Sequence, residues 1–253
     1  MSLLGTLPAG IPLVILVVGA LASGVARGFS GFGAALIFIP LASVALGPRM
    51  AAPLLLLIDF LPMIALVPGA WRLADRREVA WLSLGVVAGL PFGVWLLAQA
   101  DALTLRWLVA GVILALLAMA ASGLRFPATP NRGATLGVGA VAGVLAGVAL
   151  VPGPPVMAWL LGRRLPPATL RAVFNLFLAA SGVLTALGFA LAGLFTTALV
   201  APLLVAGPIY ALGTVIGARL FGVVPTLLFR RICYTLIAAA ALLSLPVLDP
   251  ILR

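Results

Sequence analysis

Residues 89–93 of the chain read Gly-Leu-Pro-Phe-Gly, and residues 213–217 read Gly-Thr-Val-Ile-Gly. The two stretches hold a pair of glycines at the same spacing and lie 213 − 89 = 124 positions apart. The same offset relates Arg106 to Arg230, and each of these arginines opens another long apolar run. These pairs indicate that the chain is built from two related halves.

The amino-acid composition indicates that the chain lies in a membrane. Hydrophobic residues make up 64% of the 253 and charged residues only 8%, whereas a soluble domain has about 45–50% and roughly 25%. Several runs of about 18 or more residues carry no charge, which is the length of a membrane-spanning helix. We therefore predict an all-α polytopic integral membrane protein with one transmembrane domain over residues 1–253 and about 8–10 membrane segments, some short or re-entrant. Its two inverted repeats would cover residues 10–123 and 133–247.

The charged and reactive residues exclude several functions. The net charge of +10 comes from arginines that lie between apolar runs, so membrane topology explains it and nucleic acid is not an expected partner. There is no histidine and one cysteine, which rules out an imidazole or thiolate metal site and a disulfide within the chain. We expect no cofactor. Intramembrane hydrolysis needs a nucleophile with a base or paired carboxylates, and only one acid lies deep in an apolar segment, so we predict that the protein is not an enzyme.

Arginine positions predict the orientation of the chain. If the N-terminus is outside and every segment crosses, 11 arginines lie inside and 3 outside, which agrees with the positive-inside rule. Five segments in each half is an odd number, so the second half is inverted relative to the first. We expect both termini outside in a bacterial inner membrane. The inside loops are those near residues 72–77, 125–132, 163–171 and 219–231, and the outside arginines are Arg49, Arg106 and Arg253.

The second apolar segment of each half is short. Residues 33–46 and 155–162 would rise about 21 Å and about 12 Å as helices, against a hydrocarbon core of about 30 Å. Each follows a stretch interrupted by glycine or proline, and we pair Gly31 with Gly153 at an offset of 122. Two full crossings and a re-entrant hairpin remain open. Such breaks in corresponding positions favour a transporter binding site, because the following helix aims N–H groups at an anion; close helix packing is the alternative explanation of the glycines.

Two motifs resemble signatures of the TauE/SafE sulfite-exporter family. The first is residues 28–33, Gly-Phe-Ser-Gly-Phe-Gly, followed by an apolar stretch to Pro40, and the second runs from residue 147 through 155 to Arg171. The likeness spans essentially the full chain, with one departure: residues 148–152 read Val-Ala-Leu-Val-Pro, where the family usually carries a glycine-rich break. The resemblance implies export or uptake of small sulfur-containing or carboxylated anions, such as sulfite, sulfonates or sulfoacetate.

Polar residues inside or beside the breaks complete the predicted site. Asp59 lies in the middle of an apolar segment, where an acid usually faces a cavity or a partner, and we assign it proton coupling; an arginine partner is the alternative. Arg27 could instead snorkel to the interface, and Asn175 could join two helices. The five tryptophans lie mostly near segment ends, as interfacial anchors do. The predicted substrate-binding residues are Arg27, Ser30, Gly31, Phe32, Gly33, Gly153, Pro154 and Asn175.

The function expected from these features is secondary transport of a small anion, an organosulfur or sulfite-type oxyanion or a small carboxylate, coupled to protons. Export and import fit the pattern equally. The other hypothesis is a structural or assembly subunit of a membrane complex without transport activity. Partners are the anionic substrate, protons and the lipid bilayer, with a homodimer as one option for the oligomeric state. A nucleotide-driven pump is disfavoured because the chain has no phosphate-binding P-loop motif.

Overall fold

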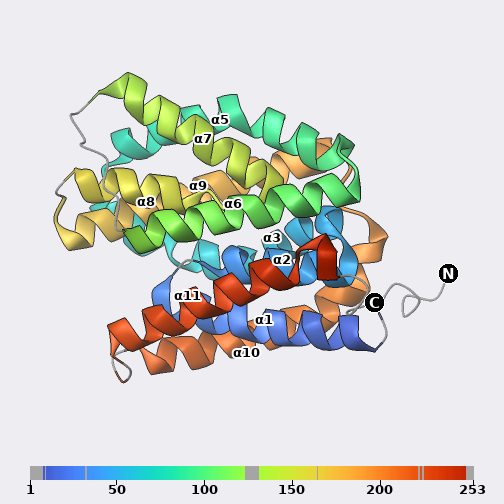
Figure 1. Cartoon of the computed structure of the whole chain (residues 1–253). Helices are drawn as coiled ribbons and strands as arrows, with labels where there is room; N and C mark the ends of the chain where they lie inside the picture. Colours follow the sequence, from blue (N-terminus) through green and yellow to red (C-terminus); the bar gives the residue numbers. More distant parts are fainter. Residues whose placement is uncertain are drawn as a thin grey trace. The chain divides into compact units, whose positions relative to one another are not determined.

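The computed structural model describes residues 8, 10–31, 33–122, 131–163, 165–221, 223 and 225–248, and all regular elements in these ranges are helices (Figure 1). In chain order they are α1 (Ile11–Ser30), α2 (Ala34–Leu46), α3 (Pro48–Ala65), α4 (Val67–Leu73), α5 (Arg76–Gln99), α6 (Ala102–Ser122), α7 (Arg132–Ala149), α8 (Gly153–Gly162), α9 (Pro167–Leu191), the 3-10 turn η2 (Thr197–Leu199), α10 (Val200–Leu220), α11 (Thr226–Leu243) and the 3-10 turn η3 (Pro246–Leu248).

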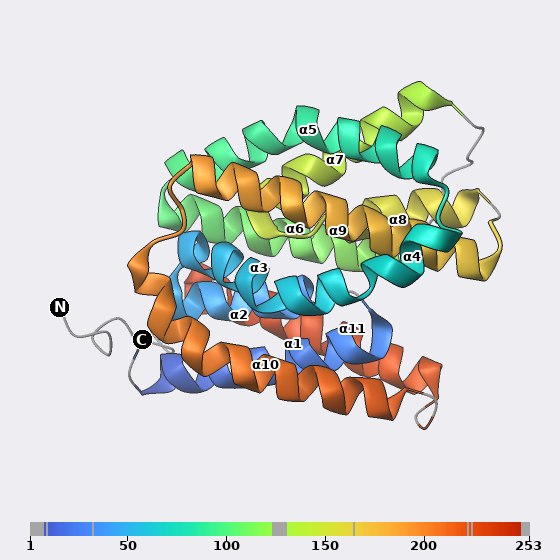
Figure 2. The same cartoon turned by 180° about the vertical axis from the view of Figure 1, so that it is seen from behind.

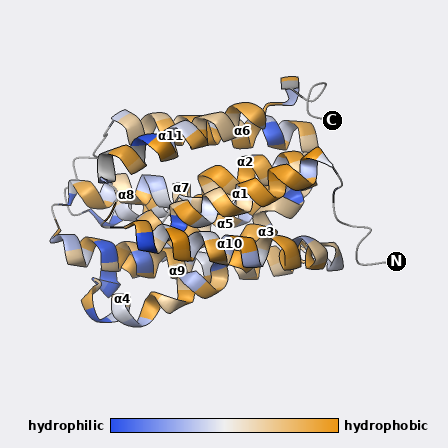
Figure 3. Ribbon diagram, turned by 90° about the horizontal axis from the view of Figure 1, so that it is seen from below, coloured by the Kyte–Doolittle hydropathy of each residue, from blue (hydrophilic) through white to orange (hydrophobic). Residues whose placement is uncertain are grey.

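Length and hydropathy make this a polytopic membrane protein. Among the described residues, seven helices are long and apolar enough to cross a bilayer: α1, α3, α5, α6, α7, α9 and η2 with α10. Hydrophobic residues dominate these helices (Figure 3). α2 and α8 have only 13 and 10 residues, so the two short segments predicted from the sequence form short helices. The predicted all-α membrane fold is confirmed.

One predicted segment is divided in two. The apolar pattern predicts a single segment over residues 50–68, whereas α3 ends at Ala65 and a separate helix, α4, begins at Val67. Pro68 lies in the first turn of α4, and a proline has no N–H to donate to the preceding turn. The chain can therefore start a new helix at this point but cannot continue the old one.

The described residues form two compact units. Unit 1 takes those within Met1–Ile58, Ala100–Leu117 and Gly193–Arg253, and unit 2 those within Asp59–Gln99 and Ala118–Ala192. Unit 1 therefore contains α1 and α2 from the first half with α10 and α11 from the second. Unit 2 combines α4 and α5 with α7, α8 and α9. The boundary between the units does not follow the boundary between the halves.

Unit 1 is organised around the contact between α1 and α10. α2 packs on α1 and on α11, and the largest side chains buried in this unit include Leu16, Phe38 and Tyr210. α1 and α10 lie side by side in both views (Figures 1 and 2). A Cβ on Gly28 would lie 2.0 Å from the carbonyl oxygen of Thr214, so the two backbones touch only because glycine is there. Small residues allow this approach in membranes, where it maximises van der Waals contact.

Unit 2 is organised around the same kind of contact between α5 and α7. A Cβ on Gly89 would lie 2.0 Å from the carbonyl oxygen of Ala140. α9 packs against α5 and α4, while α8 packs against α7 and α9. Phe189, on α9, is completely buried. Each unit therefore holds one glycine-lined helix pair, and each pair joins a helix of the first half to a helix of the second.

The two helix pairs have equivalent contacts. Gly24 faces the carbonyl oxygen of Tyr210 in α10, and Gly143 faces that of Val86 in α5. The offsets are 143 − 24 = 119 for the first helices and 210 − 86 = 124 for their partners. Three further contacts of the first pair recur in the second with these same offsets. Gly28 with Ala218 recurs as Gly147 with Val94, and Gly213 with Leu21 recurs as Gly89 with Ala140. Gly217 with Val25 recurs as Gly93 with Val144.

The order of these contacts gives the direction of the helices. Gly24 faces Tyr210 and, one turn later, Gly28 faces Thr214, so residue numbers rise together along α1 and α10. Residue numbers also rise together along α5 and α7, because Gly85 faces Leu136 and Gly89 faces Ala140. Both pairs are therefore parallel.

Candidate functional site

The break between α1 and α2, in unit 1, is held open by glycine. Gly31 has φ 77° and donates its N–H to the carbonyl oxygen of Arg27 at 2.8 Å, which ends α1. Gly33 has φ 89° and precedes α2, whose N-terminus receives no side-chain cap. Residues other than glycine rarely adopt such left-handed angles. A Cβ on either glycine would meet nothing within 4 Å, so the glycines serve backbone conformation here and not close packing. Phe32 lies outside the described residues.

A buried arginine lies at this break. Arg27, in the last turn of α1, is only 6% exposed, and its Nη1 donates to the carbonyl oxygen of Gly31. A cation is favourable at a helix C-terminus, where carbonyl groups lack helical partners. Ser30 is exposed and donates its hydroxyl to the carbonyl oxygen of Ala26 at 2.6 Å. The guanidinium of Arg27 therefore lies inside unit 1 at the break, instead of extending to the interface along the surface.

The break between α7 and α8, in unit 2, has the same length but a different composition. Three residues separate the helices, as in the first break, and α7 ends at Leu150, whose φ is 53°. Leu150 is the one described non-glycine residue with a positive φ, a conformation that costs about 1–2 kcal/mol for an L-amino acid. The departure from a glycine-rich break that the sequence shows is therefore accommodated by strain at Leu150.

The structure pairs the residues of the two breaks in a different register from the one chosen from the sequence. Both C-caps are left-handed, at Gly31 and at Leu150, so these residues correspond at an offset of 150 − 31 = 119. The sequence pairing of Gly31 with Gly153, at 122, is three residues out of register. Gly153 instead begins α8, as Ala34 begins α2. Glycines lie on either side of the second break, at 147 and 153, so a match to Gly31 could be made in more than one register.

The N-terminus of α8 differs from the sequence expectation. The expected helix begins after Pro155, whereas α8 begins at Gly153, which puts Pro154 and Pro155 in its first turn. Proline has no N–H, so α8 presents fewer N–H donors than an ordinary helix N-terminus. Gly153 itself packs on the ring of Phe174 in α9, with 3.2 Å between its built Cβ position and Cζ. The first break is therefore the better anion site, because it combines the N-terminus of α2 with Arg27.

Asn175 and Asp59 are both in unit 2. Asn175 follows Phe174 in α9 and is half-buried, and within the described residues its amide makes no hydrogen bond. Asp59 is half-buried in α3, a candidate membrane span. One turn further along α3, Met63 packs against Gly182 of α9. The structure thus brings Arg27, Ser30, Gly31 and Gly33 together in unit 1, and it brings Gly153 beside the segment of α9 that carries Asn175 in unit 2.

A buried ion pair in unit 2 was not predicted from the sequence. Glu78, in the first turn of α5, is 7% exposed, and both of its oxygens accept from Nη1 of Arg163 at 2.8 Å. The indole N–H of Trp159 donates to Oε1 of Glu78 at 3.0 Å. Arg163 and Trp159 belong to the end of α8, so the cluster fixes this short helix to α5. These residues are 85 and 81 positions from Glu78, a separation at which no local pattern signals contact.

One sequence assignment is wrong. Trp159 is 4% exposed and buried, so it is not an interfacial anchor, in contrast to the exposed Trp71, Trp95 and Trp107. Its position was inferred from the segment end alone, whereas the carboxylate of Glu78 accepts from its indole N–H inside the unit. Arg106, an expected outside arginine, is buried near the start of α6 and donates from Nε and Nη2 to the carbonyl oxygen of Ser244 at 3.2 and 3.1 Å. That carbonyl ends α11.

Comparison with known proteins agrees with this architecture. A family model described as "Sulfite exporter TauE/SafE" matches residues 15–244, which includes both breaks and both glycine-lined helix pairs. Neither a curated protein nor a solved structure gives a significant match to the chain.

Proposed function

The chain belongs to the sulfite exporter TauE/SafE family and is a multi-pass membrane transporter, and from this premise we propose that it is a secondary transporter of a small oxyanion. The observation that carries the proposal is the break between α1 and α2, where the buried Arg27 lies beside the uncapped N-terminus of α2. A guanidinium and backbone N–H groups both favour anions. The substrate class is a sulfite-type or organosulfur oxyanion or a small carboxylate.

The break between α7 and α8, in unit 2, offers an anion contacts of another kind. Its prolines remove N–H donors, so binding there depends on the N–H of Gly153 and on the side-chain amide of Asn175. An amide can donate to an oxyanion and accept from a protonated one. Pro154 shapes the first turn of α8. The repeat of the helix-pair contacts at offsets 119 and 124 supports two related halves, and the parallel pairs agree with a chain that has an odd number of crossings in each half.

We assign energy coupling to the carboxyl of Asp59, because an ionisable group within a membrane segment commonly marks a proton pathway. The protein resides in a bacterial inner membrane with both termini outside, and it carries out transport and no enzymatic reaction. Because the arginine bias and the odd number of segments per half favour it, the second half is inverted relative to the first.

Substrate binding is tested by a thermal-shift screen of purified protein against sulfite, sulfonates, thiosulfate and small carboxylates. A ligand that binds the folded state raises the melting temperature in proportion to the logarithm of its concentration once saturation is passed. We expect at least one anion to stabilise the wild type and to lose its effect in Arg27→Gln. Arg219→Gln, which removes an exposed arginine of α10, is the matched control and keeps the effect. Stabilisation by cations and by no anion would refute the proposed substrate class.

Coupling is tested in proteoliposomes with an imposed pH gradient, using the anion found in the screen. Asp59→Asn is expected to abolish gradient-driven flux while the protein stays folded in the membrane. Asp101→Asn is the matched control, because Asp101 is an exposed acid before α6, and its flux should equal that of the wild type. Equal flux in Asp59→Asn and in the control would remove Asp59 from the mechanism.

A further inference from the structure

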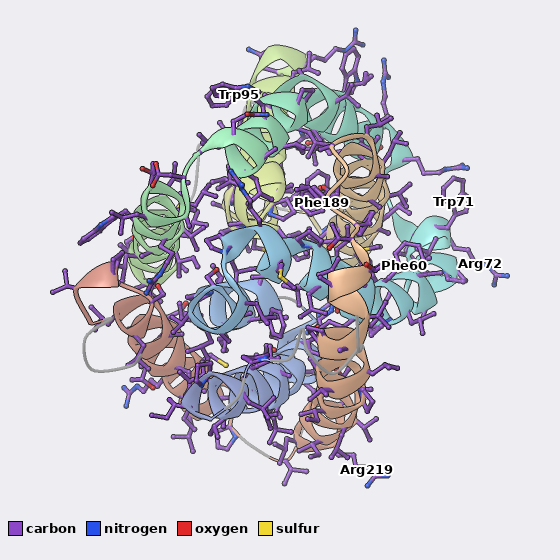
Figure 4. All side chains as sticks on the ribbon, turned by 90° about the vertical axis from the view of Figure 1, so that its right-hand side faces the viewer. Phe60, Trp71, Arg72, Trp95, Phe189 and Arg219 are labelled. Atoms are coloured by element: carbon purple, nitrogen blue, oxygen red, sulfur yellow. The ribbon has the colours of Figure 1, made fainter. Side chains whose placement is uncertain are left out.

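Four exposed arginines of unit 2 lie at the N-terminal ends of α5 and α7 and on α4. Arg72 is in α4, Arg76 and Arg77 begin α5, and Arg132 begins α7. Two tryptophans lie among them, Trp71 in α4 and Trp81 in α5. We call these six residues the Trp–Arg cluster. Trp71 and Arg72 project outward from α4 (Figure 4).

Two of the arginines lie over tryptophan rings, at cation–π distance. The Cζ atom of Arg76 lies 5.6 Å from the ring centroid of Trp71, and that of Arg132 lies 5.6 Å from the ring centroid of Trp81. Arg76 and Trp81 are five residues apart on α5, which is about 7.5 Å along the helix axis, so both pairs lie at the N-terminal end of α5. The guanidinium groups of exposed arginines carry N–H donors that can hold a phosphate by two parallel hydrogen bonds.

The acids near the cluster are already engaged. Asp75 caps α5 by accepting from the N–H groups of Arg77 and Glu78 at 3.0 and 3.2 Å, and Glu78 is paired with Arg163. In the part of the chain that the structure describes, none of the four cluster arginines forms an ion pair. The positive charge of the cluster is therefore not neutralised within unit 2.

The position of the arginines adds to this excess. A helix N-terminus carries a partial positive charge, so acids are favoured there and cations are not. Arg76 and Arg77 nevertheless occupy the first turn of α5, and Arg132 the first turn of α7. α7 is capped by the neutral Asn131, which accepts from the N–H of Gly133 at 2.9 Å. Two helix N-termini and four guanidinium groups thus add positive charge that external anions would stabilise.

Apolar side chains beside the cluster determine the kind of anion. Leu66, Trp71 and Leu73 are 43%, 54% and 60% exposed on and next to α4. A free phosphate would leave this apolar surface in water, whereas a lipid covers it with acyl chains while its headgroup meets the arginines. Tryptophan is enriched at this level of a membrane for the same reason. Groups of four or more cationic residues beside membrane helices bind anionic headgroups.

We propose that the Trp–Arg cluster is a binding surface for the phosphate headgroups of anionic glycerophospholipids. The lipid phosphates bind the exposed guanidinium groups of Arg72, Arg76 and Arg132, and the acyl chains lie against the apolar side chains of α4. The site is independent of the transported substrate and of the helix breaks. It gives α4, which continues no other helix, a fixed position at the membrane surface.

The test uses the full chain in phosphatidylcholine bilayer discs, with and without phosphatidylglycerol, and counts bound phosphatidylglycerol by native mass spectrometry together with the melting temperature. Each arginine near the surface is worth about a fivefold change in affinity, so R72Q/R76Q/R132Q should bind phosphatidylglycerol about 100-fold more weakly. The matched control is R219Q/R231Q, which removes two exposed arginines of unit 1. It should retain the wild-type lipid count and the wild-type stabilisation.

A second variant distinguishes loss of the lipid site from misfolding of the first variant. R76K/R132K keeps the charges and loses the planar guanidinium groups that bind phosphate by two hydrogen bonds, so a folded protein with an intermediate lipid affinity is expected. The proposal is overturned if phosphatidylglycerol does not stabilise the wild type, or if both glutamine variants lose binding equally. It is also overturned if inorganic phosphate added to phosphatidylcholine discs stabilises the wild type as much as phosphatidylglycerol does, because the ligand would then be a free anion and not a lipid.

Discussion

Replacing Gly89 by alanine tests the glycine-lined contact between α5 and α7. The new Cβ would lie 2.0 Å from the carbonyl oxygen of Ala140, whereas ordinary contact begins at 3.4 Å. The helices must therefore separate by about 3.4 − 2.0 = 1.4 Å at this point, because a backbone oxygen cannot rotate away as a side chain can. Overpacking of this kind costs about 1–3 kcal/mol, and alanine recovers at most about 1 kcal/mol of helix propensity.

We expect Gly89→Ala to lose about 2 kcal/mol of stability, since the separation also weakens the neighbouring glycine contacts. For a chain of this size that lowers the melting temperature by about 4–8 °C, measured by size-exclusion chromatography of detergent-solubilised protein after heating. Gly28→Ala, whose Cβ would also lie 2.0 Å from a carbonyl oxygen, should lose a similar amount. Gly111→Ala is the control, because a Cβ there meets nothing within 4 Å. Equal melting temperatures for Gly89→Ala and Gly111→Ala would refute the reasoning.

Three further substitutions test local features by the same thermal assay. Gly31→Ala should cost about 1 kcal/mol through its left-handed φ alone, and a melting temperature equal to that of wild type would contradict this. Arg163→Gln leaves the buried carboxylate of Glu78 without its cation and should cost about 3 kcal/mol; Glu78→Gln/Arg163→Gln should be more stable than Arg163→Gln, and a less stable double variant would argue against the pair. Hydrogen bonds from Thr104 hold the pKa of Asp101 below its ordinary value of 3.8, so Asp101 stabilises the fold above pH 3.8 and loses this effect as the pH falls through the lowered pKa. The deficit of Asp101→Ala should therefore be present at neutral pH and disappear in acid; a pH-independent deficit would exclude this carboxylate.

The helices could be predicted from the sequence because the membrane leaves few alternatives to a helix. The apolar runs gave the positions of the long helices and of the short α2 and α8, with the boundaries within a few residues. α4 was missed because it is a seven-residue helix within an apolar run. Hydropathy shows that residues are apolar, but it does not show where one helix ends and the next begins inside such a run. The proline at position 68 was the available signal.

The site could be predicted only in part. Left-handed glycines at 31 and 33 follow from local sequence, because the residue type and the backbone conformation are directly linked. The buried position of Arg27 does not, since a helix-end arginine is equally suited to the interface. Glu78 and its partners depend on how α8 packs on α5, which no local pattern contains. The register between the breaks was misassigned because the glycines at 147 and 153 flank the true equivalent, Leu150, whose strained conformation the sequence does not reveal.

The measurement that tests the account most directly is the labelling of equivalent loops from the two sides of the membrane. Single cysteines are placed at Asp101, after α5, and at Val223, after α10, in a Cys233→Ala background, and are treated in intact cells with an impermeant thiol reagent. Two inverted halves require these equivalent loops to lie on opposite faces, so Asp101→Cys should be labelled from outside and Val223→Cys only after the membrane is opened. Labelling of both from the same face would contradict the inverted arrangement.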